Sequence, residues 1–204
     1  AMLQEALQPG AAQLCLHIAG DSTAALVLNI MEALAPDSVW RPRRVRFEHG
    51  GQIAGPQIAR ARRLGVVIAQ PRAEGAPLRA WTSAGIPVAY GSDMLRNPFY
   101  YVMAAVTEPT VPGQAISREA AVAMLTRAPA YAEFTERDKG TLAPGMLADL
   151  AVLSQDVFTV PPEALPGTTS VLTVVGGRVV YDHRARAAAR DPTRYPPTRF
   201  AHTP

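Results

Sequence analysis

The chain has little of three things that often define a site: cysteine, lysine and long apolar runs. Cys15 is the single cysteine among 204 residues, which excludes an internal disulfide and a zinc site built from a cysteine cluster. Its neighbours Leu14 and Leu16 are apolar, so we expect a buried and inert thiol. Lys139 is the only lysine, so any chemistry that needs a lysine depends on that one position.

Charged residues make up 18% of the chain and hydrophobic residues 48%, a composition that can bury a sizeable core. The formal net charge is +3, but no basic stripe alternates with aromatic residues, so we expect no nucleic-acid partner. No run approaches the ~20 apolar residues that cross a bilayer, and the first residues lack a charged segment followed by an apolar one. We therefore expect a cytoplasmic protein with a small-molecule substrate and no membrane partner.

Four short β-prone runs follow one another along the first half of the chain, at residues 13–17, 44–49, 65–70 and 86–91. A segment with helical spacing comes after each of them. Leu26, Ile30 and Leu34 predict the buried face of the first helix, and Pro56 predicts the start of the second. Alternation of strand and helix predicts a parallel sheet with helical cover.

Later helices are predicted from the residues at their ends. Pro77 opens a short helix, and Asn97, which precedes a proline, predicts the cap of a helix that runs through Thr107. Ser117 predicts the cap of a further helix that ends near Pro129. We expect the partial barrel domain to cover residues 2–138.

From residue 139 the sequence becomes rich in turn-forming and β-branched residues. The runs 149–153 and 170–181 predict strands, and the pair Gly176-Gly177 predicts a two-residue hairpin turn. We therefore expect a small β module over residues 139–182. Residues 183–204 are rich in arginine, alanine and proline and predict a poorly ordered basic tail.

Three polar residues end predicted strands: His17, His49 and Asp93. In a barrel of parallel strands, side chains from the carboxyl ends converge on one axial site. Alternation along the strands would place Val45, Phe47 and His49 on the inward face together with His17. Imidazole is a good zinc ligand, and a carboxylate beside a metal-bound water can accept and return its proton.

Structural roles for the same residues stay open at this point. A lone histidine at a strand end is more often a hydrogen-bonded structural residue than a ligand, and Asp93 can stabilise the turn that follows it. Asp21 is expected to cap the helix after His17, and Glu48, out of phase with His49, to face the helices. His183 and His202, near the carboxyl end, are expected to be exposed to solvent. Phe99, Tyr100 and Tyr101 are expected to form an aromatic cluster in the core.

Several segments together resemble the amidohydrolase superfamily, in particular amidohydrolase family 3. The segments 17–21 (HIAGD), 46–50 (RFEHG) and 89–93 (AYGSD) are similar to the strand-end motifs of that family. The most specific likeness is 140–153 (GTLAPGMLADLAVL), which resembles a signature of the form G-x-L-x-P-G-x-x-A-D-L-x-V-L. The segment 174–181 (VVGGRVVY) resembles the closing hairpin of the family.

The resemblance implies that His17 and His49 are metal ligands on barrel strands five and six. It implies that Asp93 is the aspartate of strand eight, which binds metal and moves protons while an amide, lactam or related carbon–nitrogen bond is hydrolysed. The family begins its site with a His-x-His pair on the first strand, and this chain contains no His-x-His. The resemblance implies a divalent metal, zinc, and the site that would hold it is therefore expected to be incomplete in this chain alone.

The fold expected from these features is the carboxyl-terminal half of a (β/α)8 TIM-type barrel, with about four βα units and a β-sandwich-like module. Four strands cannot close a barrel, so the first and last would be open edges. Two copies could form a homodimer, or a separate amino-terminal half could complete the barrel. The alternative to a hydrolase is a non-catalytic, truncated half-barrel that associates with itself or with a partner chain.

Overall fold

The computed structural model describes residues 2–50, 53–93, 97–108 and 110–185. A parallel sheet and an antiparallel sheet account for the strands of this part of the chain. The parallel sheet has the order β1-β2-β3-β4, with β1 at Cys15–His17, β2 at Arg46–Glu48, β3 at Val67–Gln70 and β4 at Val88–Tyr90. The four predicted strands and their parallel order are confirmed.

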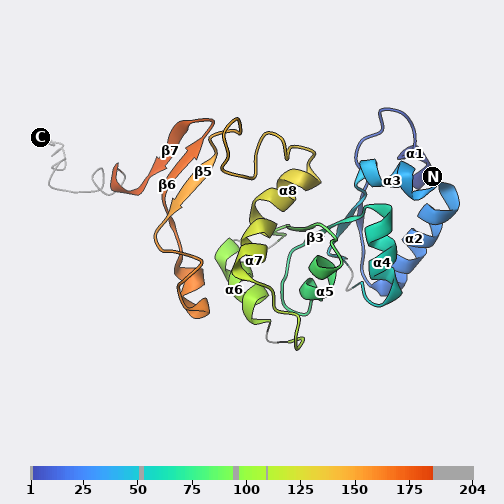
Figure 1. Ribbon diagram of the computed structural model, residues 1–204, viewed down its shortest axis with the longest axis horizontal. Helices are drawn as coiled ribbons and strands as arrows, with labels where there is room; N and C mark the ends of the chain where they lie inside the picture. The colour runs from blue at the N-terminus through green and yellow to red at the C-terminus, as the bar shows by residue number, and fades with distance from the viewer. Residues whose placement is uncertain (1, 51–52, 94–96, 109, 186–204) are drawn as a thin grey trace, which may run out of the picture.

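The helices follow the strands in the predicted alternation, as Figure 1 shows. They are α1 (Met2–Glu5), α2 (Asp21–Leu34), α3 (Asp37–Trp40), α4 (Pro56–Leu64), α5 (Leu78–Ser83), α6 (Pro98–Thr107), α7 (Arg118–Leu125) and α8 (Arg127–Ala132), with short 3-10 turns η1 (Arg41–Arg43) and η3 (Pro162–Gly167). Asn97 caps α6 by accepting bonds from the amides of Phe99 and Tyr100. Ser117 caps α7 in the same way.

Two helix predictions need correction. The buried face of α2 is formed by Ala24, Leu28 and Met31, whereas Leu26 is 58% exposed. Apolar residues surround most of this helix, so their spacing alone does not select the face. The single helix predicted after Ser117 is two helices in the structure, because the backbone leaves the helical conformation at Thr126. Pro129 then falls in the first turn of α8, where a proline costs no helical hydrogen bond.

The main core lies between the parallel sheet and its helices. Val45, Phe47 and Ile68 of the strands pack there with residues such as Leu28 and Trp40. A second, smaller cluster joins Val67 and Ala89 of the sheet to Ala132 of α8. Since Val67 and Ile68 are successive residues of β3, the two clusters lie on opposite faces of the sheet. Each face of the sheet is therefore partly covered, with the larger cover on the side of α2 to α5.

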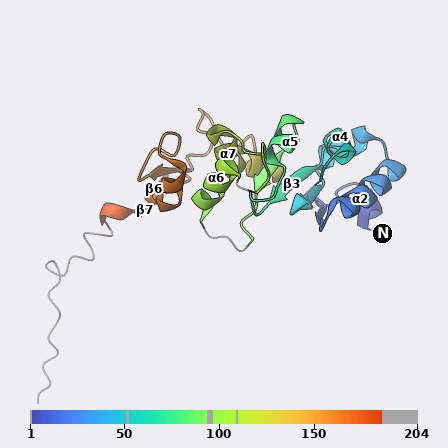
Figure 2. The same ribbon diagram turned by 90° about the horizontal axis from the view of Figure 1, so that it is seen from below.

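The carboxyl-terminal strands form an antiparallel sheet in the order β5-β6-β7, with β5 at Leu150–Leu153, β6 at Ser170–Val175 and β7 at Arg178–Asp182. The turn between β6 and β7 is the predicted pair Gly176-Gly177, and both glycines have positive φ angles of 55° and 76°. No residue of these three strands is buried. Figures 1 and 2 place this sheet at the opposite end of the molecule from α1 and α2.

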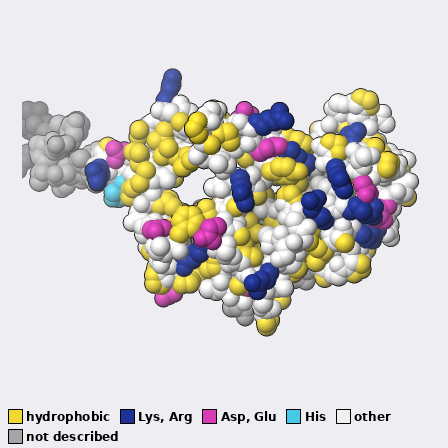
Figure 3. All heavy atoms as spheres, viewed as in Figure 1, with side chains coloured by type: hydrophobic (Ala, Val, Ile, Leu, Met, Phe, Trp, Pro, Cys, Tyr) yellow, Lys and Arg dark blue, Asp and Glu magenta, His cyan; other side chains and the backbone are white. Residues whose placement is uncertain are grey.

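Hydrophobic side chains gather on the end of the molecule that carries the β5–β7 sheet, as Figure 3 shows. Val179 and Val180 are 60% and 61% exposed there. The three aromatic residues predicted for the core divide: Tyr101 is buried, Phe99 packs against the core, and Tyr100 is 38% exposed. The part of the chain that the structure describes has no helix that is both long and apolar enough to span a membrane. Of the predicted tail, residues 186–204, which include His202, lie outside the described residues.

Arg44, just before β2, fastens the amino end of that strand to α8 and to the segment that follows it. The Arg44 guanidinium donates to both carboxylate oxygens of Glu136 and to the carbonyl of Tyr131. It also stacks over the Tyr131 ring, with 3.7 Å from the guanidinium carbon to the ring centroid. Hydrogen bonding to Arg44 lowers the pKa of Glu136 to about 2. This ion pair ties the strand that leads to His49 to the helix beneath the sheet.

The pair predicts a loss of stability in acid. The pKa of Glu136 is lowered in the folded chain, so its contribution is complete above the unfolded value of 4.5 and is lost as the pH falls toward about 2. We expect the free energy of unfolding of the Glu136→Gln variant to depend less on pH in this window than that of the wild type. Urea unfolding at pH 6, 4 and 2.5 measures it, and parallel pH profiles for the two proteins would contradict the assignment.

Candidate metal centre

His17 is the last residue of β1, and His49 follows the last residue of β2, at the same end of the sheet. The two rings lie side by side, with 5.1 Å between their centroids and 35° between their planes. The structure therefore brings together two of the three residues that the sequence predicts for the site.

The faces of β2 differ from the prediction. Cys15 is in register with Arg46, and His17 with Glu48, so these side chains share one face. Val45 and Phe47 lie on the other face, in the core with the helices. The prediction that Val45 and Phe47 share the face of His17 is therefore wrong.

His49 reaches His17 because the backbone leaves the strand conformation at that residue. Its φ angle is +70°, in the left-handed region, which a non-glycine residue adopts rarely. Its amide still donates to the carbonyl of Ala69 at 2.8 Å. The alternation of faces thus stops at Glu48, and the turn places the imidazole of His49 beside that of His17.

Gly50 and Trp81 support this turn. Gly50 also has a positive φ, of 65°, and a β-carbon added there would lie 2.8 Å from Ile68 Cγ2 and 3.0 Å from the Trp81 ring. The Trp81 indole N–H donates to the carbonyl of Ile53 at 2.8 Å. Both Trp81 and Ile53 are fully buried. The loop that begins at His49 is therefore held between β3 and α5 by close packing and one buried hydrogen bond.

Glu48 and Arg46 are the inner-face residues that sequence reasoning missed. Glu48 was expected to face the helices, but its Oε1 pairs with Arg46 Nε at 2.5 Å on the face of His17. Partial burial raises the pKa of the Cys15 thiol, with Arg46 lowering it and Glu48 raising it by smaller amounts. The sequence could have predicted the face of Arg46 and Glu48, because the segment Val45-Arg46-Phe47-Glu48 alternates apolar and polar residues. The apolar residues face the larger core, so the polar ones face the other side of the sheet.

Cys15 and Asp21 also depart from the predictions. Cys15 is exposed, because β1 is an edge strand with no neighbour on its outer side among the described residues. Asp21 is the first residue of α2 and does not cap it, since the cap position is Gly20. The Asp21 carboxylate instead accepts a bond from the Ala54 amide at 3.0 Å. It therefore fastens the loop after His49 to the start of α2.

Asp93 follows the end of β4 and has a positive φ of 44°. Its side chain is exposed. Within the described ranges, no group of three or more His, Cys, Asp and Glu side chains is arranged to hold a metal ion. His17 and His49 place two imidazole rings side by side, and a zinc centre needs at least one more protein ligand than two histidines. The metal-binding role of Asp93 stays a prediction.

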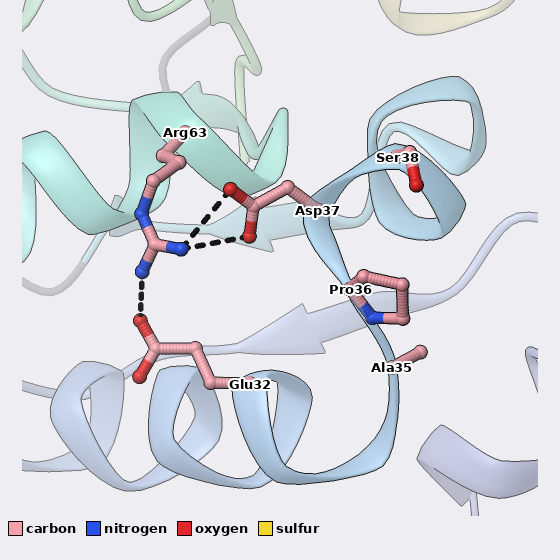
Figure 4. Close-up of a pocket in the computed structure, with 6 residues that line it drawn as sticks. All are labelled: Glu32, Ala35, Pro36, Asp37, Ser38 and Arg63. Atoms are coloured by element: carbon pink, nitrogen blue, oxygen red, sulfur yellow. Dashed lines mark hydrogen bonds and ion pairs between the residues drawn. The ribbon is translucent and has the colours of Figure 1, made fainter.

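A surface hollow of about 460 Å³ lies elsewhere, between α2, α3 and α4. Figure 4 shows that Glu32 and Asp37 point toward the guanidinium of Arg63, with bonds of 2.5 and 2.8 Å. Glu32 also pairs with Arg60 at 2.6 Å. The charges of this hollow are therefore matched within the helical layer, and the network has a structural role in joining α2 to α4.

Solved structures with the same fold are metal-dependent hydrolases and amidohydrolases. An uncharacterized metal-dependent hydrolase from Pyrococcus furiosus is 24% identical, with a TM-score of 0.54 over 65% of this chain and 31% of its own. An amidohydrolase from Thermotoga maritima is 15% identical, with a TM-score of 0.65 over 88% and 45%. N-isopropylammelide isopropylaminohydrolase from Burkholderia multivorans is 22% identical, with a TM-score of 0.60 over 83% and 47%.

This chain thus spans less than half the length of each of these structures. No curated protein matches it. A family model matches residues 1–181, which include both histidines, Asp93 and the whole β5–β7 sheet. That model describes the amidohydrolase family, and this chain belongs to it.

Proposed function

We propose that the chain is the carboxyl-terminal part of a metal-dependent hydrolase that cleaves the carbon–nitrogen bond of a non-peptide amide or a cyclic amide. The observation that carries the proposal is the pair of imidazoles, 5.1 Å apart at the ends of adjacent parallel strands. Family membership supports it, as does the isopropylaminohydrolase named among the structures of the same fold. A cytoplasmic location is part of the same proposal.

The proposed roles follow from the chemistry of each group. His17 and His49 each offer one neutral ring nitrogen. Imidazole nitrogen is, with thiolate sulfur, the usual ligand of zinc and related divalent ions in proteins. A divalent metal, when bound, supplies a nucleophile from water near neutral pH. Asp93 accepts the proton of the attacking water at a carboxylate oxygen and returns it to the leaving nitrogen. We propose zinc as the ion.

The second candidate is a non-catalytic half-barrel that associates with itself or with a partner chain. The observation that favours it is the two-histidine set, since the described residues place no third ligand beside it. Under either candidate the four parallel strands need further strands to close a barrel. We propose that these come from another copy of this chain or from an amino-terminal half of the fold.

Zinc binding separates a functional pair from two structural histidines. We expect His17→Ala and His49→Ala each to lower the affinity for Zn²⁺ by at least about tenfold, because each removes one nitrogen donor. Isothermal titration of the purified chain with Zn²⁺ measures the affinity. His183→Ala is the matched control, since His183 is an exposed histidine that follows β7 and lies beside Tyr181.

Equal zinc affinities for the wild type and both variants would contradict the proposal. Hydrolysis is measured in the same samples as release of amine from a panel of simple amides and lactams. Release that requires added Zn²⁺ and is lost in both variants supports the hydrolase. No release from any member of the panel, together with zinc affinities that neither substitution changes, would favour the non-catalytic candidate.

A further inference from the structure

The segments that carry His17 and His49 are joined to each other on one side by the sheet. The amide of Ile18, the residue after His17, donates to the carbonyl of Glu48, the residue before His49, at 3.0 Å. Ile18 is buried and packs in the main core. The chain on this side of the imidazole pair is therefore fixed both by a backbone bond and by burial.

The chain after His49 leaves the sheet and depends on other contacts. The amide of Ile53 donates back to the carbonyl of Gly50 at 3.2 Å, which fixes Ile53 relative to the turn at His49. The next residue, Ala54, donates its amide to Oδ1 of Asp21 at 3.0 Å. The loop that begins at His49 is thus tied to a second element through one carboxylate.

Asp21 offers a firm attachment point, because it belongs to a helix that packs in the core. It is the first residue of α2 and follows His17 closely along the chain. Ala24 and Leu28 on the next turns of α2 are fully buried. An acceptor carried by a packed helix is held more precisely than one carried by a loop. The start of α2 therefore gives the His49 loop a fixed position relative to His17.

The two attachments lie on either side of the imidazole pair. One runs from Ile18 to Glu48, and the other from Asp21 to Ala54. Between them the rings of His17 and His49 lie with 5.1 Å between their centroids. The φ of His49 is +70°, and a non-glycine residue stays in the left-handed region where the surrounding structure holds it there. The bond from Ala54 to Asp21 is one of the contacts that can hold it.

We propose that Asp21 is a positioning residue for the imidazole pair. Its carboxylate acts through the Ala54 amide, which holds the loop that carries His49 against the start of the helix that follows His17. Without this bond the loop is free to move from α2, and the His49 ring moves away from the His17 ring. The link from this geometry to a metal rests on the proposed function, whereas the geometry belongs to the metal-free chain.

Proximity of the two rings is measured by NMR in the absence of metal. The wild type should show a nuclear Overhauser effect between the ring protons of His17 and His49, and each ring should shift the signals of the other. The His49→Ala variant gives the His17 signal without its neighbour. We expect Asp21→Ala to lose the Overhauser effect and to move the His17 signal toward its position in that variant.

Two further variants separate the hydrogen bond from other effects. Asp21→Asn removes the charge but keeps an acceptor oxygen, so it should retain the wild-type ring signals. Asp149 is the matched control, since its Oδ1 accepts from the Gly176 amide at 2.7 Å in an exposed bond of the same kind within the β5–β7 module. Asp149→Ala should leave the ring signals unchanged. Far-UV circular dichroism shows whether each variant is folded.

Should Asp21→Ala fail to fold, Asp21→Ser takes its place. Serine favours the start of a helix, and its hydroxyl oxygen is one bond shorter than the carboxylate, so it does not reach the Ala54 amide. Unchanged ring signals in the folded variant would overturn the proposal. Equal changes in Asp21→Asn would also overturn it, because they would assign the effect to the negative charge at the start of α2. So would an equal change in Asp149→Ala.

Zinc titration separates this inference from the proposed function. We expect Asp21→Ala to bind Zn²⁺ about threefold to tenfold more weakly than the wild type, a smaller loss than removal of a partner bonded directly to a ligand. Ring signals that depend on Asp21 in a chain that binds no zinc would retain the positioning role and remove the metal role. Zinc affinity that falls in the His17 and His49 variants but not in Asp21→Ala would retain the metal role and overturn this inference.

Discussion

Replacing Trp81 with alanine is expected to lower the free energy of unfolding by about 3–5 kcal/mol. The side chain is fully buried, and its indole N–H is bonded to the carbonyl of Ile53. The variant leaves a cavity under the loop that begins at His49 and an unsatisfied carbonyl within it. Chemical denaturation monitored by circular dichroism measures the loss, which is a large share of the ~5–15 kcal/mol that stabilises a typical domain.

Trp40 provides the control for this variant. It is equally buried, and its indole N–H donates to the carbonyl of Met31 at 2.8 Å, but it lies against α2 and not under the His49 loop. We expect Trp40→Ala to cost a similar amount of stability and to leave zinc affinity unchanged at temperatures where it is folded. Trp81→Ala should lower both quantities. Equal zinc affinities in the two variants would show that Trp81 supports the fold and not the site.

Gly50→Ala should have the second largest effect, because it strains the turn that brings His49 to His17. An alanine in the left-handed region costs about 1–2 kcal/mol, and the added β-carbon at 2.8 Å from Ile68 Cγ2 adds about 1–3 kcal/mol of overpacking. Relief of the clash requires the 49–50 backbone to move away from β3. We therefore expect lower stability and at least about tenfold weaker zinc binding.

Gly55 isolates the contribution of the clash. It lies in the same loop with a φ of 52°, and a β-carbon there would meet nothing within 4 Å. Gly55→Ala makes no clash but carries its own conformational cost, because φ 52° and ψ −133° lie in a region open mainly to glycine. We therefore expect a loss of stability with unchanged zinc affinity, and zinc titration of both folded variants gives the comparison. If the two glycine variants bind zinc with equal affinity, packing around Gly50 does not position His49.

The fold was predictable from the sequence where local signals are strong. Asn97 and Ser117 mark the starts of α6 and α7, and Gly176-Gly177 marks the turn between β6 and β7, because capping and turn chemistry act within a few residues. The exposure of Cys15 was not predictable in the same way. A thiol between two leucines is usually buried, and here the outcome depends on β1 being the edge of the sheet.

The site was predictable in its residues more than in its geometry. The positions of His17 and His49 at strand ends followed from the β-prone runs, and the structure places their rings together. Their shared direction did not follow from alternation, because the left-handed φ of His49 interrupts it. The inward position of Glu48 depends on register with β1, which is a long-range property of the sheet. Strand alternation therefore predicts faces only within one strand.

The most direct measurement of the central claim is a zinc titration followed by NMR of the histidine ring nitrogens. His17→Ala and His49→Ala assign the two site resonances, and His183 serves as the internal reference. If the two imidazoles form one metal-binding pair, the resonances of His17 and His49 shift together with a common affinity while that of His183 stays in place. Independent shifts of His17 and His49, or a shift of His183 at the same zinc concentration, would contradict a shared site.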